Sequence, residues 1–377
     1  MENEFNPFFV SGYRGAEYFC DRENETLKLK QHIANGKNTT VFAIRRIGKT
    51  GLIQHVFSSF INKPKVVCIY VDILGTKNIL EFTNQLATAI YNRFPENNSI
   101  GKKIMSAIRL LRPLISFDTL SGSPELSFSL GNEKLYETTI AQLFGFLDAQ
   151  NIKVVFAIDE FQQILAYPEQ NTEAILRTHI QQLKNTQFIF CGSDQKLMHE
   201  IFNTAKRPFF ASCTSMSLGF IEFEVYAQFI KGVFEKHKRK ISEEAISYVL
   251  NFTKQHTFYT QYLCNFLFAL TKKSIKLIDV QFSIKEIFLQ NESIYYQYKN
   301  LLTEAQWKLL RAIAKEDRLT NPHSRGFIEK YKLGTSSMVT RGMEALLAKE
   351  MIYQNAGVEK AYYEVYDKFL MRWLQYK

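Results

Sequence analysis

The sequence lacks the long apolar run that a membrane-spanning helix requires. A helical span takes about 18 to 20 consecutive apolar residues. The most apolar stretch here, Tyr262 to Leu270, is short and contains Asn265. The N-terminal residues, MENEFNPFF, are acidic and lack the basic and then apolar layout of a signal peptide. We therefore expect a cytoplasmic protein without a membrane partner.

Cysteine is scarce as well. The chain has five widely separated cysteines, and none lies near another cysteine or a histidine at the spacing of a metal site. This pattern predicts reduced thiols, mostly buried, and neither a disulfide framework nor a zinc site. No pattern typical of a protease, a nuclease or a metal hydrolase occurs. The formal net charge of +10 permits a polyanionic partner, but solvated lysine-rich faces explain it equally well.

The clearest motif is FAIRRIGKTGL, which runs from Phe42 to Leu52 between an apolar strand and a helical run. Backbone N–H groups in such a turn and at the start of the following helix can surround a polyphosphate. Lys49 would reach the β and γ phosphates, and the Thr50 hydroxyl would ligate Mg²⁺. The sequence thus predicts a phosphate-binding loop formed by Arg45, Arg46, Ile47, Gly48, Lys49, Thr50 and Gly51.

A second apolar strand, KVVFAI, ends in Asp159-Glu160, about 110 residues after Lys49. Asp159 would hold Mg²⁺, usually through a water ligand. Glu160 would act as the general base that polarises the attacking water. A strand-end acid pair is a weak signal alone, but it becomes strong downstream of a Gly-Lys-Thr turn.

Strands alternate with helices around these motifs, which predicts an α/β fold with a parallel sheet sandwiched by helices. The expected strands are 38–44, 65–73, 153–158 and 187–191, with helices at 76–93 and 133–150. Alternating residues around Ser121-Gly122-Ser123-Pro124 predict a β-hairpin inserted near 112–130. We expect this P-loop core to occupy 1–218.

From Gly219 the sequence changes to helical patterns, which predicts an α-helical lid at 219–300. The last part, 301–377, predicts a winged helix of three helices followed by a hairpin. Its first helix places Trp307, Leu310 and Ile313 inward. Thr335 can cap the N-terminus of the third helix. In that helix we expect Met338, Met343, Leu346 and Leu347 to face a core.

The third helix of a winged helix can enter the major groove of DNA. Here it offers Thr335, Ser336, Ser337, Thr340 and Arg341, of which only Arg341 is charged. The segment is only mildly basic, so a packing or regulatory role stays open beside DNA binding.

Taken together, these motifs resemble those of the archaeal-type ATPases, a prokaryotic family related to AAA+ proteins, to origin-recognition ATPases and to the signalling (STAND-like) ATPases. The resemblance covers nearly the whole chain and rests on NPFFVSGYRGAEYFCDRENE, RRIGKTGLI, VVFAIDEFQQI, FIFCGS, RPFF, HTFYTQYLC and the winged helix. It implies binding of ATP with Mg²⁺, slow hydrolysis and a nucleotide-dependent switch in which nucleotide lies between core and lid.

The resemblance also implies roles for single residues. The segment with Phe19 and Arg22 would pack on the adenine, and Ser193 would contact the γ-phosphate or the attacking water. Arg207 would reach nucleotide in cis or across a subunit boundary, or would only anchor its own loop. Asp21 replaces a glycine that is usual in the base-binding segment. Near the phosphates, Ala43 replaces the first loop glycine and Asp194 stands where an arginine is common. The changes at Ala43 and Asp194 bear on the rate of ATP hydrolysis rather than on the binding of nucleotide.

Three hypotheses follow. In the first, the chain is an ATP-dependent switch that acts on a protein partner or on a second copy of itself. In the second, it is a DNA-binding regulator or a mobile-element-associated protein, in which ATP or ADP is mainly a structural ligand. In the third, it is a degenerate scaffold that binds no nucleotide.

Overall fold

The computed structural model describes residues 5–94, 102, 106, 114–117, 123–127, 133–150, 152–355 and 361–377. The chain divides into two compact units, Ser11–Phe220 and Ile221–Lys377 with Met1–Val10. Within the described residues, none of the helices has the length and apolar character that crossing a bilayer would require.

The first unit is built on a five-stranded parallel sheet with the strand order β2-β5-β6-β1-β7. The strands are β1 (Thr39–Phe42), β2 (Val66–Asp72), β5 (Lys153–Asp159), β6 (Thr186–Gly192) and β7 (Thr214–Ser217). The predicted parallel α/β sheet is therefore confirmed. The sequence did not predict β7, because this short edge strand, TSMS, has no apolar run.

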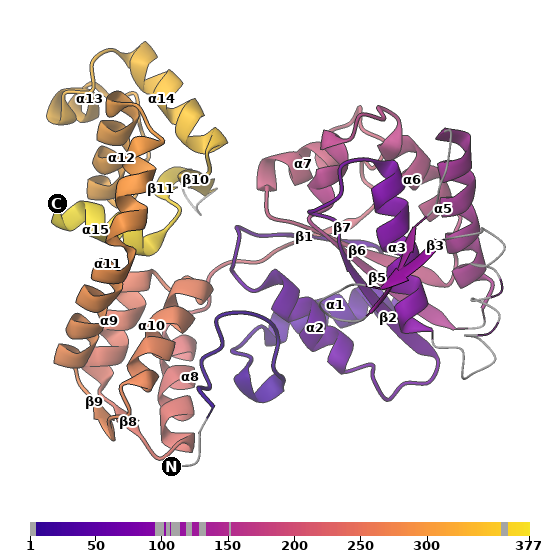
Figure 1. Ribbon diagram of the computed structural model, residues 1–377, viewed down its shortest axis with the longest axis horizontal. Helices are drawn as coiled ribbons and strands as arrows, with labels where there is room; N and C mark the ends of the chain where they lie inside the picture. Colours follow the sequence, from indigo (N-terminus) through magenta and orange to yellow (C-terminus); the bar gives the residue numbers. More distant parts are fainter. Residues whose placement is uncertain are drawn as a thin grey trace. The chain divides into compact units, whose positions relative to one another are not determined.

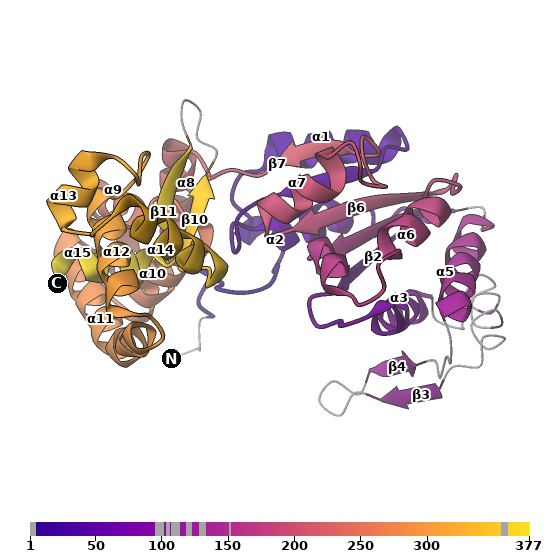
Figure 2. The same cartoon turned by 90° about the horizontal axis from the view of Figure 1, so that it is seen from above.

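Helices cover both faces of this sheet (Figures 1 and 2). One core joins the sheet to α3 (Ile79–Arg93), α5 (Glu133–Asp148), α6 (Thr172–Ile180) and α7 (Gln195–Asn203). A cluster of phenylalanines fills it, with Phe156, Phe188 and Phe190 from the strands and Phe144 and Phe202 from the helices. On the opposite face, α1 (Glu23–Ala34) packs against α2 (Lys49–Ser58).

Two strands outside this sheet, β3 (Leu114–Phe117) and β4 (Pro124–Ser127), pair antiparallel in the segment where the sequence predicted a hairpin. The predicted strand end at 128–130 and most of the turn lie outside the described residues. Leu126 is buried, and its N–H donates to Thr88 of α3. The pair is thus attached to the helical layer and not to the main sheet.

The second unit begins with helices, as predicted from Gly219 onward. These are α8 (Phe223–Lys236), α9 (Glu243–Thr253), α10 (Thr257–Ala269) and α11 (Leu277–Asn300). Two short strands, β8 (Lys240–Ile241) and β9 (Ser274–Ile275), pair between them. The last of these helices, α11, is continuous over 24 residues.

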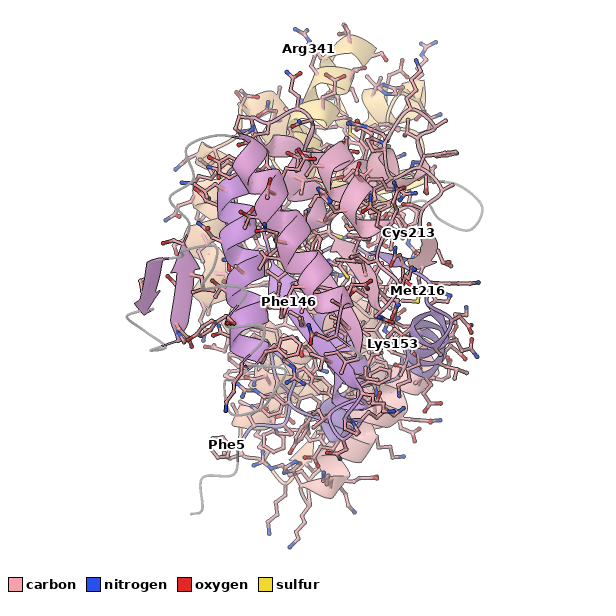
Figure 3. All side chains as sticks on the ribbon, turned by 90° about the vertical axis from the view of Figure 1, so that its right-hand side faces the viewer. Phe5, Phe146, Lys153, Cys213, Met216 and Arg341 are labelled. Atoms are coloured by element: carbon pink, nitrogen blue, oxygen red, sulfur yellow. The ribbon has the colours of Figure 1, made fainter. Side chains whose placement is uncertain are left out.

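The winged helix follows and contains α12 (Glu304–Glu316), α13 (Arg325–Tyr331), α14 (Ser336–Ala348), β10 (Ile352–Asn355), β11 (Tyr362–Val365) and α15 (Lys368–Tyr376). Thr335 caps α14 by accepting a hydrogen bond from the Met338 N–H, as predicted. The prediction that Met338 faces a core is wrong. Its side chain is 44% exposed, and the next residue, Val339, is buried in its place. Arg341 is exposed on α14 (Figure 3).

A buried ionic cluster joins the winged helix to α9. Glu364 of β11 contacts Lys254, which follows α9, and lies 3.0 Å from Lys368 of α15. Arg372 of α15 donates to the carbonyl oxygens of Asn251 and Phe252 at the C-terminal end of α9. These contacts satisfy carbonyl groups that the end of a helix leaves without partners.

Candidate functional site

The turn between β1 and α2 has the backbone of a phosphate-binding loop. Gly48 has a φ of 106°, and a Cβ atom added there would meet nothing within 4 Å. Arg46 also has a positive φ, whereas Ala43 is fully buried at the start of the turn. The small Ala43 side chain thus fits the position at which the full motif has glycine. Open space lies in front of Gly48, where α2 begins.

Thr50 and Asp159 are in direct contact. The Thr50 hydroxyl donates to Asp159 Oδ2 at 2.8 Å, and the Tyr70 hydroxyl donates to the same oxygen at 2.7 Å. Asp159 is buried at the C-terminal end of β5, and Thr50 lies in the first turn of α2. The first helix turn of the predicted phosphate loop and the acid strand end therefore meet at one edge of the sheet.

Glu160 is held by hydrogen bonds in a left-handed backbone conformation, with a φ of 55°. Its Oε2 accepts from Ser193 Oγ at 2.6 Å, from the Ser193 N–H at 3.1 Å and from Gln162 Nε2 at 2.6 Å. Because β6 lies between β1 and β5, it brings Ser193 beside both motifs. Arg45 Nε also contacts Ser193 Oγ, at 3.3 Å.

The pKa of Glu160 reflects these contacts. Burial raises it, but the hydrogen bonds from Ser193 and Gln162 and the charge of Lys49 outweigh burial, so the pKa lies below its usual value. On the neighbouring strand, the pKa of Asp72 is raised by burial and by the charges of Asp159 and Glu160. The structure thus holds Glu160 ionised, although this carboxylate is engaged by its neighbours.

The predicted base-binding segment lies against α2. The Phe19 ring stacks on His55 with centroids 4.4 Å apart, and its edge lies 3.4 Å from the position of a Cβ atom on Gly51. Arg22 is buried and donates to the Gly219 carbonyl oxygen at 2.6 Å and to Glu25 at 3.1 Å. The structure therefore brings Phe19 next to the helix of the phosphate loop, while Arg22 reaches the end of the first unit.

Arg207 has carboxylate partners of its own. It donates to Glu173 of α6 at 2.8 Å and contacts Glu200 of α7. These contacts are those of a residue that anchors its own loop, one of the three roles that the sequence left open. The role of Arg207 at the nucleotide stays a prediction.

Tyr70, Gln162 and Asp72 belong to this site, but the sequence assigned them no role. Tyr70 and Asp72 lie on β2, whose register pairs Asp72 with Asp159. The only sequence signal was the apolar strand that ends at Asp72. Gln162 approaches Glu160 because the chain turns into a short 3-10 helix (Phe161–Ala166) directly after the acid pair.

The donor set fits a magnesium ion that arrives with a nucleotide. Mg²⁺ prefers oxygen ligands and is commonly bound by one or two protein side chains together with phosphates and waters. Thr50 and Asp159 offer such oxygens side by side. Within the described residues, no group of three or more His, Cys, Asp or Glu side chains is arranged to hold a metal alone.

The parallel sheet and the phosphate-loop turn define the class of P-loop ATPases, here followed by a winged helix. Residues 19–255 match the model of a family described as "ATPase domain predominantly from Archaea", and residues 293–376 match a "Probable winged helix domain". Because the first match covers more than half of the chain, the chain belongs to this archaeal-type ATPase family.

Solved structures show the same fold. The Walker-type ATPase PABY2304 of Pyrococcus abyssi has a TM-score of 0.66 at 16% identity, covering 98% of this chain and 99% of that chain. The ORC2 protein of Aeropyrum pernix, in ADPNP–ADP complexes, has a TM-score of 0.58 at 12% identity, covering 99% and 98%. The ORC1 protein of Aeropyrum pernix, in complex with DNA, has a TM-score of 0.52 at 12% identity, covering 95% and 92%. No curated protein matches the chain.

Proposed function

We propose that this chain is an ATP-dependent switch that hydrolyses ATP slowly. Backbone N–H groups from Arg45 to Gly51 would surround the phosphates, and Lys49 would neutralise their charge. Thr50 and Asp159 would hold Mg²⁺, which would neutralise charge that develops on the phosphate oxygens. The observation that carries this proposal is the 2.8 Å contact between Thr50 and Asp159.

Glu160 would act as the general base, and its contacts support slow turnover. Its Oε2 already accepts three hydrogen bonds, and its lowered pKa makes it a weak base. At least one of these bonds would have to break before Oε2 could take a proton from water. Where the bond from the Ser193 hydroxyl is the one that breaks, Ser193 would be free to contact the γ-phosphate, the role that the family resemblance implies.

A switch needs a link between the nucleotide and a second arrangement of the chain. The residues just before the second unit provide one. The Leu218 N–H donates to the Phe42 carbonyl oxygen at 2.8 Å, and the Gly219 carbonyl oxygen accepts from Arg22. The strand of the phosphate loop and the predicted base-binding segment thus both hold the junction. The core (1–218), the lid (219–300) and the winged helix (301–377) are our proposal for the moving parts.

The site assignment is tested by ATP binding and turnover in two variants. Lys49→Ala should lose binding, because the ammonium group that would reach the β and γ phosphates is removed. Glu160→Gln should retain binding and lose turnover. Lys65→Ala is a matched control, because Lys65 is exposed next to the N-terminal end of β2, at the opposite edge of the sheet. Turnover that both site variants retain at the wild-type rate would refute the assignment.

The switch itself is tested at the junction. ATP should change the rate of chymotrypsin cleavage at Phe220, and Arg22→Met should abolish that change even at ATP concentrations that saturate the variant. Arg14→Met, at an exposed arginine in the same N-terminal segment, is the control. A cleavage rate that responds to ATP equally in wild type and Arg22→Met would contradict the proposed link.

A second candidate function is DNA binding, with nucleotide as a structural ligand. It is favoured by the exposed polar residues of α14, among them Ser336, Ser337 and Arg341. Phosphate contacts release counterions, so retention on duplex DNA should fall steeply as salt rises. Absence of binding at low salt would remove this candidate.

A further inference from the structure

The helix α11 is apolar on two opposite faces. Its inner face packs against α9, α10 and α15 and buries Val280, Ile284, Ile287 and Tyr295. A helix of a single folded unit usually needs only one such face, with polar residues on the other.

The outer face carries a stripe of four large apolar residues, here called the α11 stripe. Ile278, Phe282, Leu289 and Tyr296 are 67%, 52%, 66% and 47% exposed. At 3.6 residues per turn they fall within a sector of about 40° along most of the helix. Tyr296 is partly covered by Trp373, with ring centroids 5.6 Å apart. Exposed apolar residues scattered singly are ordinary, whereas four of them aligned along one side of a helix mark an interaction surface.

We propose that the α11 stripe binds the same stripe of a second copy of this chain, with the two helices antiparallel and related by a two-fold axis beside Leu289. A two-fold contact uses one surface twice and requires that this surface be self-complementary. Phe282 and Tyr296 are equally far from Leu289 on either side. The axis therefore places Phe282 of one copy against Tyr296 of the other, and Leu289 against Leu289.

The charges beside the stripe favour this arrangement. Lys285 and Glu292 lie on the same flank of the stripe and on opposite sides of Leu289, so the two-fold axis brings Lys285 of each copy near Glu292 of the other. Glu292 also lies 3.4 Å from Lys377 of its own chain, and its side chain stays 36% exposed. A parallel two-fold pair would instead place this flank of the two copies on opposite sides of the axis, where Lys285 and Glu292 would not meet. Only the antiparallel pair gains the two Lys285–Glu292 contacts, and these opposite charges therefore favour it.

The contact is small. One face of one helix from each copy gives a total buried area near or below about 1,200 Å², at the low end of specific interfaces. The dimer should therefore be weak and should dissociate on dilution. This inference does not rest on nucleotide binding, because every residue that it uses lies on α11.

Sedimentation velocity over a concentration series of the full chain tests the surface. Wild type should pass from monomer to dimer, and Leu289→Glu should weaken dimerisation at least tenfold. Ile61→Glu is the matched control, because Ile61 is 73% exposed in the other unit. A monomer at every concentration, or a dimer that Leu289→Glu leaves unchanged, would overturn the proposal.

Charge reversal and crosslinking test the orientation. Lys285→Glu alone and Glu292→Lys alone should weaken the dimer, and the double variant should restore it. Under mild oxidation Leu289→Cys should crosslink to itself. Phe282→Cys should not, because the two copies of that position would lie about 21 Å apart along the helices. A mixture of Phe282→Cys and Tyr296→Cys should crosslink. Efficient self-crosslinking of Phe282→Cys would indicate a parallel pair and contradict the inference.

Discussion

Gln162 should restrain the general base, and its removal should accelerate hydrolysis. In Gln162→Met the side chain keeps its length and loses the amide that donates to Glu160 Oε2 at 2.6 Å. The other amide atom, Gln162 Oε1, is buried and has no hydrogen-bond partner within the part of the chain that the structure describes. The substitution therefore removes a restraint on Glu160 without leaving a new buried polar group unpaired.

The magnitude follows from the type of bond. A hydrogen bond to an ionised group contributes roughly 1.5–3 kcal/mol, and about 1.4 kcal/mol corresponds to a tenfold change in rate. Because both bonds from Ser193 remain, only part of the restraint is lost, so we expect an increase in kcat of about tenfold. The KM for ATP should stay unchanged, since Gln162 has no predicted contact with nucleotide.

The pH dependence gives a second readout. The bond from Gln162 lowers the pKa of Glu160, so its removal raises that pKa. A general base acts in its ionised form, and the acid limb of the kcat profile should therefore move to higher pH.

A steady-state ATPase assay across pH measures both effects, with Gln163→Met as the control. The Gln163 side chain donates to the Thr76 carbonyl oxygen, and its backbone N–H donates to the Glu160 carbonyl oxygen, a bond that the substitution leaves in place. A kcat that is unchanged or lower in Gln162→Met, or an acid limb that does not move, would refute the reasoning.

Two further predictions concern stability. Gly192→Ala should destabilise the first unit by about 1–3 kcal/mol, because the added Cβ would lie 2.3 Å from Gln162 Oε1 and 2.4 Å from Met198 Cγ. Urea unfolding measures this loss, and Gly145→Ala is the control, because a Cβ atom there would meet nothing within 4 Å. Equal unfolding midpoints for the two variants would contradict the expected clash. Burial lowers the pKa of Lys368 to about 8 against an ordinary value of 10.5. Between these values the unfolded chain binds more protons, so stability should rise with pH from about 8 to 10 in wild type and more weakly in Lys368→Met. Parallel slopes of urea midpoint against pH in the two proteins would show that Lys368 does not titrate in this way.

The sequence predicted the fold well where apolar periodicity was strong. The strands around Val41, Val155 and Phe188 are buried in the sheet and have continuous apolar runs. The edge strand β7 has no such run and was not predicted. In α14, helical periodicity allowed either Met338 or Val339 to face inward, and only the packing of the winged helix decides between them.

The candidate site was predicted in part. The motifs around Lys49 and Asp159 could be read from residue type and spacing, and their meeting followed from the rule that parallel strands end at one edge. The contacts of Tyr70 and Gln162 depend on strand register and on the backbone turn after Glu160. Local sequence does not determine either of these, so both residues appeared only in the structure.

The most direct measurement of the central claim is the position of a metal ion in crystals grown with a non-hydrolysable ATP analogue and Mn²⁺. Anomalous scattering locates Mn²⁺ independently of the rest of the density. We predict one Mn²⁺ beside the Thr50 hydroxyl and near Asp159, with the triphosphate wrapped by the turn from Arg45 to Gly51. A metal and triphosphate bound elsewhere on the chain, or crystals of a nucleotide-free protein at saturating analogue, would contradict the account.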